Sequence, residues 1–170
     1  MASRGSVIPL FRQQRSNGHE TVTDARMTRF WITLQQGVEF VLRCLETMRG
    51  GEIFVPKIPS MSIMDLVRAI APECRVTFSG IRPGEKLHEV LIAPDEAWHT
   101  LEFPDMFVVE PTHPWWSDDK WEGGKRLPEG FVYSSQANPQ QLSVEALREM
   151  VAQLNGSELA MASGPVDTEA

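Results

Sequence analysis

Apolar residues return every three or four positions in several stretches of the chain, which is the spacing of an α-helix that buries one face. The clearest stretch runs from Leu34 to Met48 and is followed by Gly50 and Gly51, which favour a helix end. The second runs from Ile63 to Ile70, with Ser60 as the expected cap. Helices are predicted over residues 6–16, 33–48, 60–71, 86–92 and 143–154.

Runs of β-branched and aromatic residues alternate with these helices and predict short strands. The strands are expected at residues 21–23, 27–32, 52–56, 75–78 and 101–109. Helices alternating with strands indicate an α/β fold. We expect residues 1–154 to form one folded unit. Residues 155–170 are small, acidic and without aromatic side chains, so we expect a disordered tail there.

Composition narrows the class of protein. The chain has 170 residues, of which 42% are hydrophobic, enough for a core. No apolar run reaches the ~20 residues that cross a bilayer, and no secretory signal is visible, so we expect a cytoplasmic protein that does not enter membranes. A net charge of −7 argues against nucleic-acid binding. The four histidines and two cysteines lack the spacing of a metal site.

The richest candidate chemistry lies in residues 80–89, which read Gly-Ile-Arg-Pro-Gly-Glu-Lys-Leu-His-Glu. Pro83 and Gly84 force a sharp turn between Arg82 and Glu85. A guanidinium can fork onto two phosphate oxygens, and a carboxylate three residues later can accept hydrogen bonds from a ribose diol. The pattern therefore suits a nucleotide diphosphate, although an ordinary turn that opens a helix is an equally simple interpretation of the four residues from Arg82 to Glu85.

Cationic residues elsewhere could add to such a site. Residues 1–30 hold five arginines but only two acidic residues. Among them Arg29 could reach a phosphate, or it could form an ion pair with Asp24. Lys57 is confined between two prolines, and an exposed, solvated lysine is the competing interpretation. His88 and Glu89 could act in acid–base chemistry or could be ordinary surface side chains.

Four motifs in fixed order carry a family resemblance. They are Arg4-Gly-Ser-Val-Ile-Pro, Met27-Thr-Arg-Phe-Trp-Ile-Thr, Gly51-Glu-Ile-Phe-Val-Pro-Lys-Ile-Pro-Ser and Gly80-Ile-Arg-Pro-Gly-Glu-Lys-Leu-His-Glu. Together they resemble the C-terminal half of the inverting UDP-N-acetylglucosamine 4,6-dehydratases. Those enzymes are extended short-chain dehydrogenase/reductases of the polysaccharide-biosynthesis branch, and they begin pseudaminic acid synthesis for flagellin modification.

The resemblance implies the substrate-binding part of an incomplete Rossmann domain. The complete enzymes bind NADP in an N-terminal half that also holds a Tyr-x-x-x-Lys catalytic pair, and this chain contains no match to that pair. By resemblance, the diphosphate and ribose contacts are Arg82 and Glu85, a further substrate contact is Arg29, and weaker candidates are Thr28 and Lys57. Ser3 and Arg4 resemble residues that line the cofactor. No catalytic residue and no metal ligand is expected.

Two functions follow from this resemblance. The chain could be the UDP-N-acetylglucosamine-binding portion of a dehydratase that works beside a separate Rossmann half, or a non-catalytic fragment that binds UDP-sugar weakly or mediates subunit association. Met1-Ala2 stands where the family usually has x-Gly before Ser-Arg-Gly-Ser. We therefore expect Met1 to be an internal family methionine that is used as an initiator.

Overall fold

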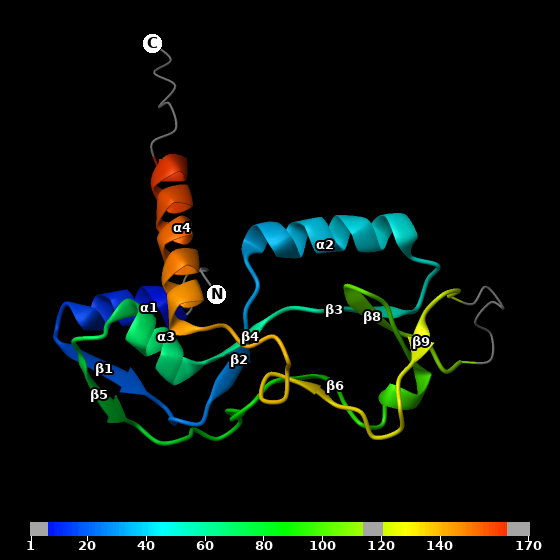
Figure 1. The fold of residues 1–170 in the computed structure, drawn as a ribbon, viewed down its shortest axis with the longest axis horizontal. Helices are drawn as coiled ribbons and strands as arrows, with labels where there is room; N and C mark the ends of the chain where they lie inside the picture. The colour runs from blue at the N-terminus through cyan, green and yellow to red at the C-terminus, as the bar shows by residue number, and fades with distance from the viewer. Residues whose placement is uncertain (1–6, 114–120, 163–170) are drawn as a thin grey trace, which may run out of the picture.

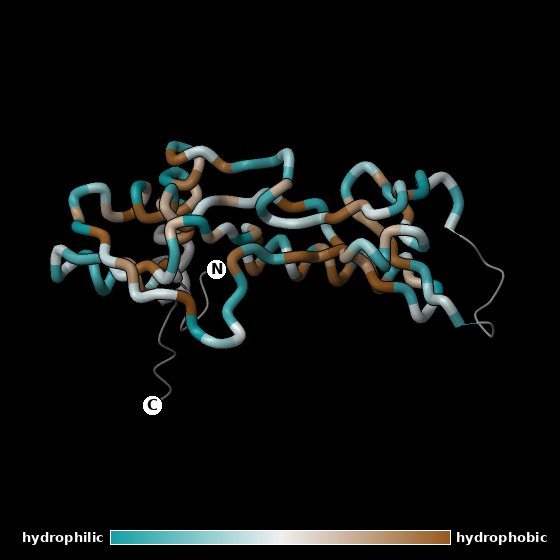
Figure 2. Tube along the Cα trace, turned by 90° about the horizontal axis from the view of Figure 1, so that it is seen from below, coloured by the Kyte–Doolittle hydropathy of each residue, from teal (hydrophilic) through white to brown (hydrophobic). Residues whose placement is uncertain are grey.

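The protein is elongated and has two lobes, as the computed structural model in Figure 1 shows. The structure describes residues 7–113 and 121–162. In the perpendicular view of Figure 2, hydrophobic residues occur in both lobes. Each lobe has its own cluster of buried side chains, so the two lobes are stabilised by separate cores.

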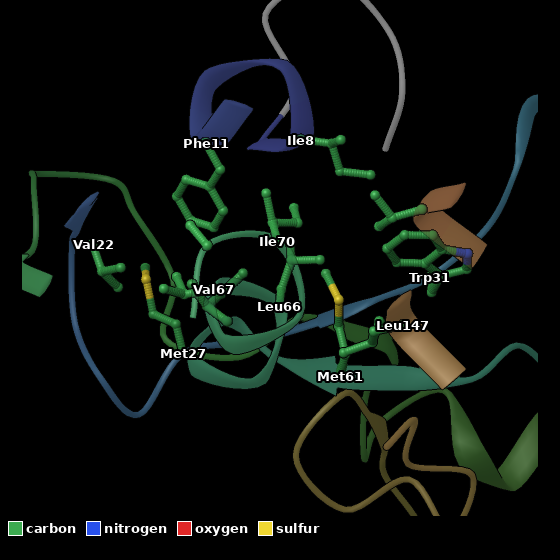
Figure 3. Close-up of a cluster of buried hydrophobic side chains, with 13 residues drawn as sticks. Ile8, Phe11, Val22, Met27, Trp31, Met61, Leu66, Val67, Ile70 and Leu147 are labelled. Atoms are coloured by element: carbon green, nitrogen blue, oxygen red, sulfur yellow. The ribbon is translucent and has the colours of Figure 1, made fainter. Parts of the chain in front are cut away.

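The first lobe, here called the helical lobe, combines three helices with a parallel pair of strands. Its elements are α1 (Val7–Arg15), β1 (His19–Val22), α3 (Ile63–Ile70), β5 (Arg75–Phe78) and α4 (Val144–Ala162). Strand β1 pairs with β5 in parallel. Figure 3 shows Leu66, Val67 and Ile70 of α3 between Ile8 and Phe11 of α1, Met27 and Val22 on one side, and Trp31, Met61 and Leu147 of α4 on the other. Burial of this cluster supplies the apolar stabilisation of the lobe.

The second lobe, here called the sheet lobe, is built on a four-stranded antiparallel sheet in the order β3-β8-β7-β9. Its elements are β3 (Ile53–Pro56), the short 3-10 helix η1 (Ala97–His99), β7 (Thr100–Glu102), β8 (Met106–Val109) and β9 (Lys125–Arg126). Helix α2 (Leu34–Thr47) runs alongside β3 in Figure 1. Residues of β8 are buried throughout, which is expected of a central strand.

Two small antiparallel pairs connect the lobes. Strand β2 (Thr28–Phe30) pairs with β4 (Ser60–Ser62), and β6 (Val90–Ile92) pairs with β10 (Tyr133–Ser134). Tyr133 holds this junction because its hydroxyl both accepts from the Ile58 amide at 2.9 Å and donates to the Ile58 carbonyl at 2.9 Å. The ring of Tyr133 also lies 5.0 Å from that of Phe30. The junction is therefore fixed by polar and aromatic contacts together.

Local sequence signals explain the helices that were predicted correctly. Thr33 caps α2 through a capping box with Gln36, and the helix ends before Gly50 as expected. Helix α3 buries the four residues that its spacing predicts, although its cap is Ser62 rather than Ser60. Ser60 is unavailable as the cap because it is the first residue of β4, paired with Phe30.

One predicted helix is absent, and another ends later than predicted. Residues 86–92 do not form a helix: 86–89 are non-helical and are followed by strand β6. Helix α4 continues to Ala162 and passes through Asn155-Gly156, where its end was predicted. Residues 163–170 lie outside the described residues, so disorder there stays a prediction.

A buried carboxylate lies in the core of the helical lobe. Glu20 shares the inward face of β1 with Val22 and is fully buried. Neither of its carboxylate oxygens has a hydrogen-bond partner among the described residues. Burial raises the pKa of the Glu20 carboxyl from 4.5 to about 7, and the charge of Glu73 adds to this shift. The ionised form is therefore disfavoured in the folded state.

This burial predicts a pH-dependent loss of stability. The pKa of Glu20 is higher in the folded than in the unfolded chain. The protonated carboxyl therefore stabilises the folded state fully below about pH 4.5, and this stabilisation is lost as the pH rises through 7. We expect Glu20→Gln to raise the free energy of unfolding at pH 8 by on the order of 2 kcal/mol relative to wild type, and to change it little at pH 4. Urea unfolding at both pH values measures this. The control is Glu129→Gln at an exposed carboxylate, and equal pH profiles for wild type and Glu20→Gln would contradict the assignment.

Candidate functional site

The segment between β5 and β6 forms a tight turn at the positions that the sequence indicated. Gly80 and Gly84 both have a φ of +82°, a conformation that side chains rarely adopt. The Glu85 amide donates to the Arg82 carbonyl at 3.0 Å, and the Glu85 carboxylate accepts from the Arg82 amide at 3.3 Å. Thr23 donates to the same carboxylate at 3.2 Å. Glu85 therefore fixes the shape of the turn that presents Arg82.

Arg82 is exposed at the tip of this turn. Over the part of the chain that the structure describes, its guanidinium has neither an ion-pair partner nor a hydrogen-bond acceptor. A guanidinium offers five N–H donors in a fork that matches phosphate or carboxylate oxygens. Arg82 can therefore bind an anion without first breaking an internal contact.

Arg29, unlike Arg82, has internal partners. Most of them lie in residues 86–89, a segment here called the strap. One terminal nitrogen donates to the carbonyls of Thr28 at 2.7 Å and Leu87 at 3.0 Å, and the other donates to the Lys86 carbonyl at 2.9 Å. Its Nε lies 3.6 Å from the Glu89 carboxylate, and only 19% of the side chain is exposed. The guanidinium thus holds the strap against β2.

The alternative ion pair between Arg29 and Asp24 is wrong. Asp24 bonds to Arg26 instead, through contacts of 3.0 and 2.8 Å to the guanidinium and 2.8 Å to the amide. These hydrogen bonds lower the pKa of the Asp24 carboxyl to about 2. Asp24 is thus paired within its own turn, and Arg29 is left to contact the strap.

Thr28 belongs to a hydrogen-bonded network that fastens the strap from its other side. Its hydroxyl lies 2.8 Å from His88 Nδ1 and 2.7 Å from the Ser135 hydroxyl. Ser135 is fully buried, and its oxygen accepts from the Glu89 amide at 2.9 Å. Two backbone bonds complete the attachment, from the Thr28 amide to Leu87 and from the Ser135 amide to Glu89. Because these tertiary bonds need an extended strap, they exclude the helix predicted there.

Sequence reasoning missed Ser135. It is one of two consecutive serines in a stretch with no recognisable motif, and it reaches the strap across 46 residues of sequence. No local pattern marks such a contact, because it arises only when β10 pairs with β6.

Lys57 lies in another part of the molecule. Its ammonium forms an ion pair with Glu102 at 2.7 Å and sits 4.9 Å from the centre of the Phe107 ring. Within the described ranges, no hydrogen bond or ion pair joins Lys57 to residues 80–89. The structure therefore brings Thr28, Arg29, Arg82 and Glu85 to one loop and its support, whereas the side-chain contacts of Lys57 are with Glu102 and Phe107 of the sheet lobe.

The remaining expectations concern the cofactor-lining residues, a metal site and membrane spans. Ser3 and Arg4 lie outside the described residues. No group of three metal-binding side chains occurs within residues 7–113 and 121–154. None of the helices described here combines the length and the apolar character needed to span a bilayer.

A family model described as polysaccharide biosynthesis protein matches residues 1–111, and this chain belongs to that family. It is 44% identical over 92% of its length to the inverting UDP-N-acetylglucosamine 4,6-dehydratase of Campylobacter jejuni subsp. jejuni serotype O:2. It is also 35% identical over 91% of its length to a UDP-glucose 4-epimerase of Rickettsia canadensis. The resemblance seen in the four motifs is thus confirmed.

A solved structure supports the fold class. The crystal structure of Pen from Bacillus thuringiensis matches 91% of this chain with a TM-score of 0.77 and 34% sequence identity, and the match covers 48% of that chain. The α/β class and the partial coverage of a larger fold are confirmed. The chain spans about half the length of its relatives, namely 49% of the Campylobacter dehydratase and 47% of the Rickettsia epimerase.

The contacts of Arg29 predict a positioning role. Arg29→Lys keeps the charge but cannot form the same set of hydrogen bonds, so we expect two amides to exchange with solvent at least about tenfold faster, equivalent to a loss of ~1.4 kcal/mol or more. They are the Glu89 amide, which donates to Ser135, and the Thr28 amide, which donates to Leu87. Hydrogen exchange measured by NMR reports on these amides individually.

The matched control is Arg26→Lys, because Arg26 is an exposed arginine whose partner Asp24 lies outside the strap. It should leave exchange in the strap unchanged. Equal exchange rates in wild type and Arg29→Lys would show that the Arg29 contacts do not hold the strap.

Proposed function

We propose that this chain is the UDP-sugar-binding portion of an inverting UDP-N-acetylglucosamine 4,6-dehydratase. The observation that carries the proposal is the exposed Arg82 guanidinium, which has no partner within the described ranges and stands on a turn shaped by Glu85. Two relatives with different reactions, a dehydratase and an epimerase, both have UDP-linked sugars in their names. The higher identity to the dehydratase favours that reaction over epimerisation.

In this proposal, Arg82 binds the diphosphate. Its fork can donate to oxygens of both phosphate groups, and the absence of an internal partner lowers the cost of binding. Glu85 already accepts from Thr23 and from its own turn, yet a carboxylate has about four acceptor positions. The remaining positions can accept from the ribose hydroxyls without disrupting the turn.

Arg29 and Thr28 support this site by holding the strap. Their side chains already bond to strap carbonyls, to His88 and to Ser135. We therefore assign them a positioning role toward Arg82, and any direct contact of Arg29 with phosphate would come in addition. Lys57 is the weakest candidate, because its ion pair with Glu102 would have to open first.

The cofactor of the complete enzyme is NADP in this proposal, and it would be held outside the described residues. The glycines with positive φ that the structure describes include the adjacent Gly50 and Gly51, but they do not follow the Gly-x-Gly-x-x-Gly spacing of a phosphate-cradling loop. No step of the reaction is assigned to residues of this chain. The finer assignments, namely UDP-N-acetylglucosamine as substrate, a cytoplasmic location and a place in pseudaminic acid synthesis, rest on the resemblance to the dehydratases.

Titration calorimetry with UDP and UDP-N-acetylglucosamine tests the binding role. We expect Arg82→Ala to weaken binding of both ligands by ~1–3 kcal/mol, because a charge-assisted fork to the diphosphate is lost. Arg75→Ala, an exposed arginine on β5, is the matched control and should bind as wild type does. Unchanged affinity in Arg82→Ala would rule out the assignment.

A reaction assay separates the two functional classes. Wild-type chain incubated with NADP and UDP-N-acetylglucosamine should yield no 4-keto product by itself, because no Tyr-x-x-x-Lys pair is present. Product should appear once the remaining half of a dehydratase is added. Product from this chain alone would contradict the proposal. UDP-sugar binding without product in the mixture would favour the alternative of a non-catalytic binding fragment.

A further inference from the structure

Three side chains beside the strap form a continuous chain of hydrogen bonds, here called the relay. The Ser135 hydroxyl lies 2.7 Å from the Thr28 hydroxyl, which in turn lies 2.8 Å from Nδ1 of His88. The Ser135 oxygen also accepts from the Glu89 amide at 2.9 Å and lies 3.2 Å from the Thr28 carbonyl. The relay therefore joins β2 to the strap and to the residue that follows β10. Strands β2 and β6, which flank it, lie between the two lobes in Figure 1.

The direction in which the relay protons point depends on His88. Each hydroxyl carries one proton, so it can donate only once, whereas its oxygen can accept more than once. The Nδ1 atom of a histidine accepts when the ring is neutral with its proton on Nε2, and it donates when the ring is charged. A change in the charge of His88 therefore reverses the bond between His88 and Thr28.

Every donor in the relay has an acceptor in both charge states. With a neutral His88, Thr28 donates to Nδ1 and Ser135 donates to the Thr28 hydroxyl oxygen. With a charged His88, the ring donates to Thr28, Thr28 donates to Ser135, and Ser135 donates to the Thr28 carbonyl. The Ser135 oxygen accepts from the Glu89 amide throughout. The relay can thus hold the strap whether or not His88 is charged.

Ser135 is the member that makes this reversal possible. It is fully buried. Within the described residues, the hydrogen-bond partners of the Thr28 hydroxyl are Ser135 and His88. When His88 donates, Ser135 is therefore the acceptor that is left for the Thr28 proton. A partly buried hydroxyl without an acceptor is costly, so loss of Ser135 penalises the charged state in particular.

Resting on the proposed function, we propose that Ser135 is a positioning residue of the UDP-sugar site and acts through this reversible relay. The relay holds the strap, which continues directly from the turn that carries Arg82 and Glu85. Within the described residues, Ser135 forms no hydrogen bond with Arg82 or Glu85, so its effect on a ligand passes through the strap. Ser135 thereby keeps the site in place over the pH range in which histidine changes charge.

Other charged groups surround His88 and must be separated from it experimentally. The hydrogen bonds from Arg26 are the main cause of the low pKa of Asp24, and a charge on His88 adds to the effect. Residues 134–138, which supply Ser135, contain no titratable side chain. The charged groups on the elements around His88 are Asp24 and Arg26 before β2, Arg29 on β2, and Arg82, Glu85, Lys86 and Glu89 on the turn and the strap.

Amide exchange of the ligand-free chain tests the relay. The reporter is the Thr28 amide, which donates to the Leu87 carbonyl at 3.0 Å and so reports attachment of the strap. Ser135→Ala removes the acceptor of the Glu89 amide at any pH, but it strands the Thr28 proton only when His88 is charged. Relative to wild type, we expect the protection factor of the Thr28 amide to fall at least about fivefold further at about pH 5 than at about pH 7.5. Equal losses at the two pH values would overturn the relay.

Two further variants link this effect to the relay. Ser134→Ala is the matched control, because the neighbouring hydroxyl accepts from the Ala137 amide at 3.3 Å and is not part of the relay. It should leave protection of the Thr28 amide as in wild type at both pH values. Ser135→Ala combined with His88→Gln should show no additional loss at acid pH, because residue 88 then no longer titrates. An additional loss that persists in this double variant would assign it to another charged group and overturn the proposal.

A measurement on the wild type does not depend on how the variants fold. At about pH 7.5, the nitrogen-15 chemical shifts of the His88 ring should show a proton on Nε2 and none on Nδ1, because Thr28 donates to Nδ1 in the neutral state. A proton on Nδ1 under these conditions would overturn the reversal.

Ligand binding connects the relay to the proposed site. UDP-N-acetylglucosamine is the probe, because it has no terminal phosphate group that titrates near about pH 6. By calorimetry, the affinity of Ser135→Ala relative to wild type should be at least about fivefold lower at about pH 5 than at about pH 7.5, and Ser134→Ala should bind as wild type does. A pH-dependent effect on exchange without a matching effect on affinity would overturn the positioning role. Absence of binding by the wild type would instead overturn the proposed function and the positioning role with it, while the exchange result would still decide on the relay.

Discussion

The attachment of the strap to β2 is the interaction on which the site geometry depends. Arg29 donates to the carbonyls of residues 86 and 87, and the backbone amide of Thr28 donates to Leu87 as well. Without these bonds, fewer contacts would remain: those of Thr23 to Gly80 and Glu85, and those of the Thr28 and Ser135 side chains to His88 and Glu89. A partly buried guanidinium is well suited to this task, because it stays charged and satisfies several carbonyls at once.

The two arginines at the centre of the sequence argument therefore differ in what they can do. Arg82 is exposed and free of internal partners within the described residues, whereas Arg29 is mostly buried and already engaged. A site divided in this way keeps one cation ready for a ligand and uses the other to hold the loop in place. Preorganisation of this kind reduces the entropy that a ligand must otherwise remove from the loop.

Local signals in the sequence predicted the parts of the fold that local chemistry determines. Helix α2 was predicted well because Thr33 and Gln36 form its cap. The turn after Gly80 was predicted because Pro83 restricts the backbone and Gly84 permits a positive φ. The strap was predicted wrongly as a helix because its conformation depends on distant donors. The buried Ser135 is the clearest case, since its effect requires a strand pairing that no short motif announces.

The same distinction applies to individual side chains. Asp24 was a reasonable partner for Arg29 by distance along the chain, but Arg26 is closer and captures both carboxylate oxygens. The contacts that the motif residues make therefore came only from the structure, and their roles in binding stay predictions.

The parallel pairing of β1 with β5 affects how the protein reaches its folded state. The hydroxyls of Thr21 and Thr77 meet across this pair although 56 positions separate them in sequence. Closing so large a loop is entropically costly, and contacts of this kind slow folding. We therefore expect α2, whose cap and spacing are local, to form early while the strand pair closes late. A nascent chain would then present a hydrophobic helix before its helical lobe is complete, and chaperones that recognise such segments would meet it first at this element.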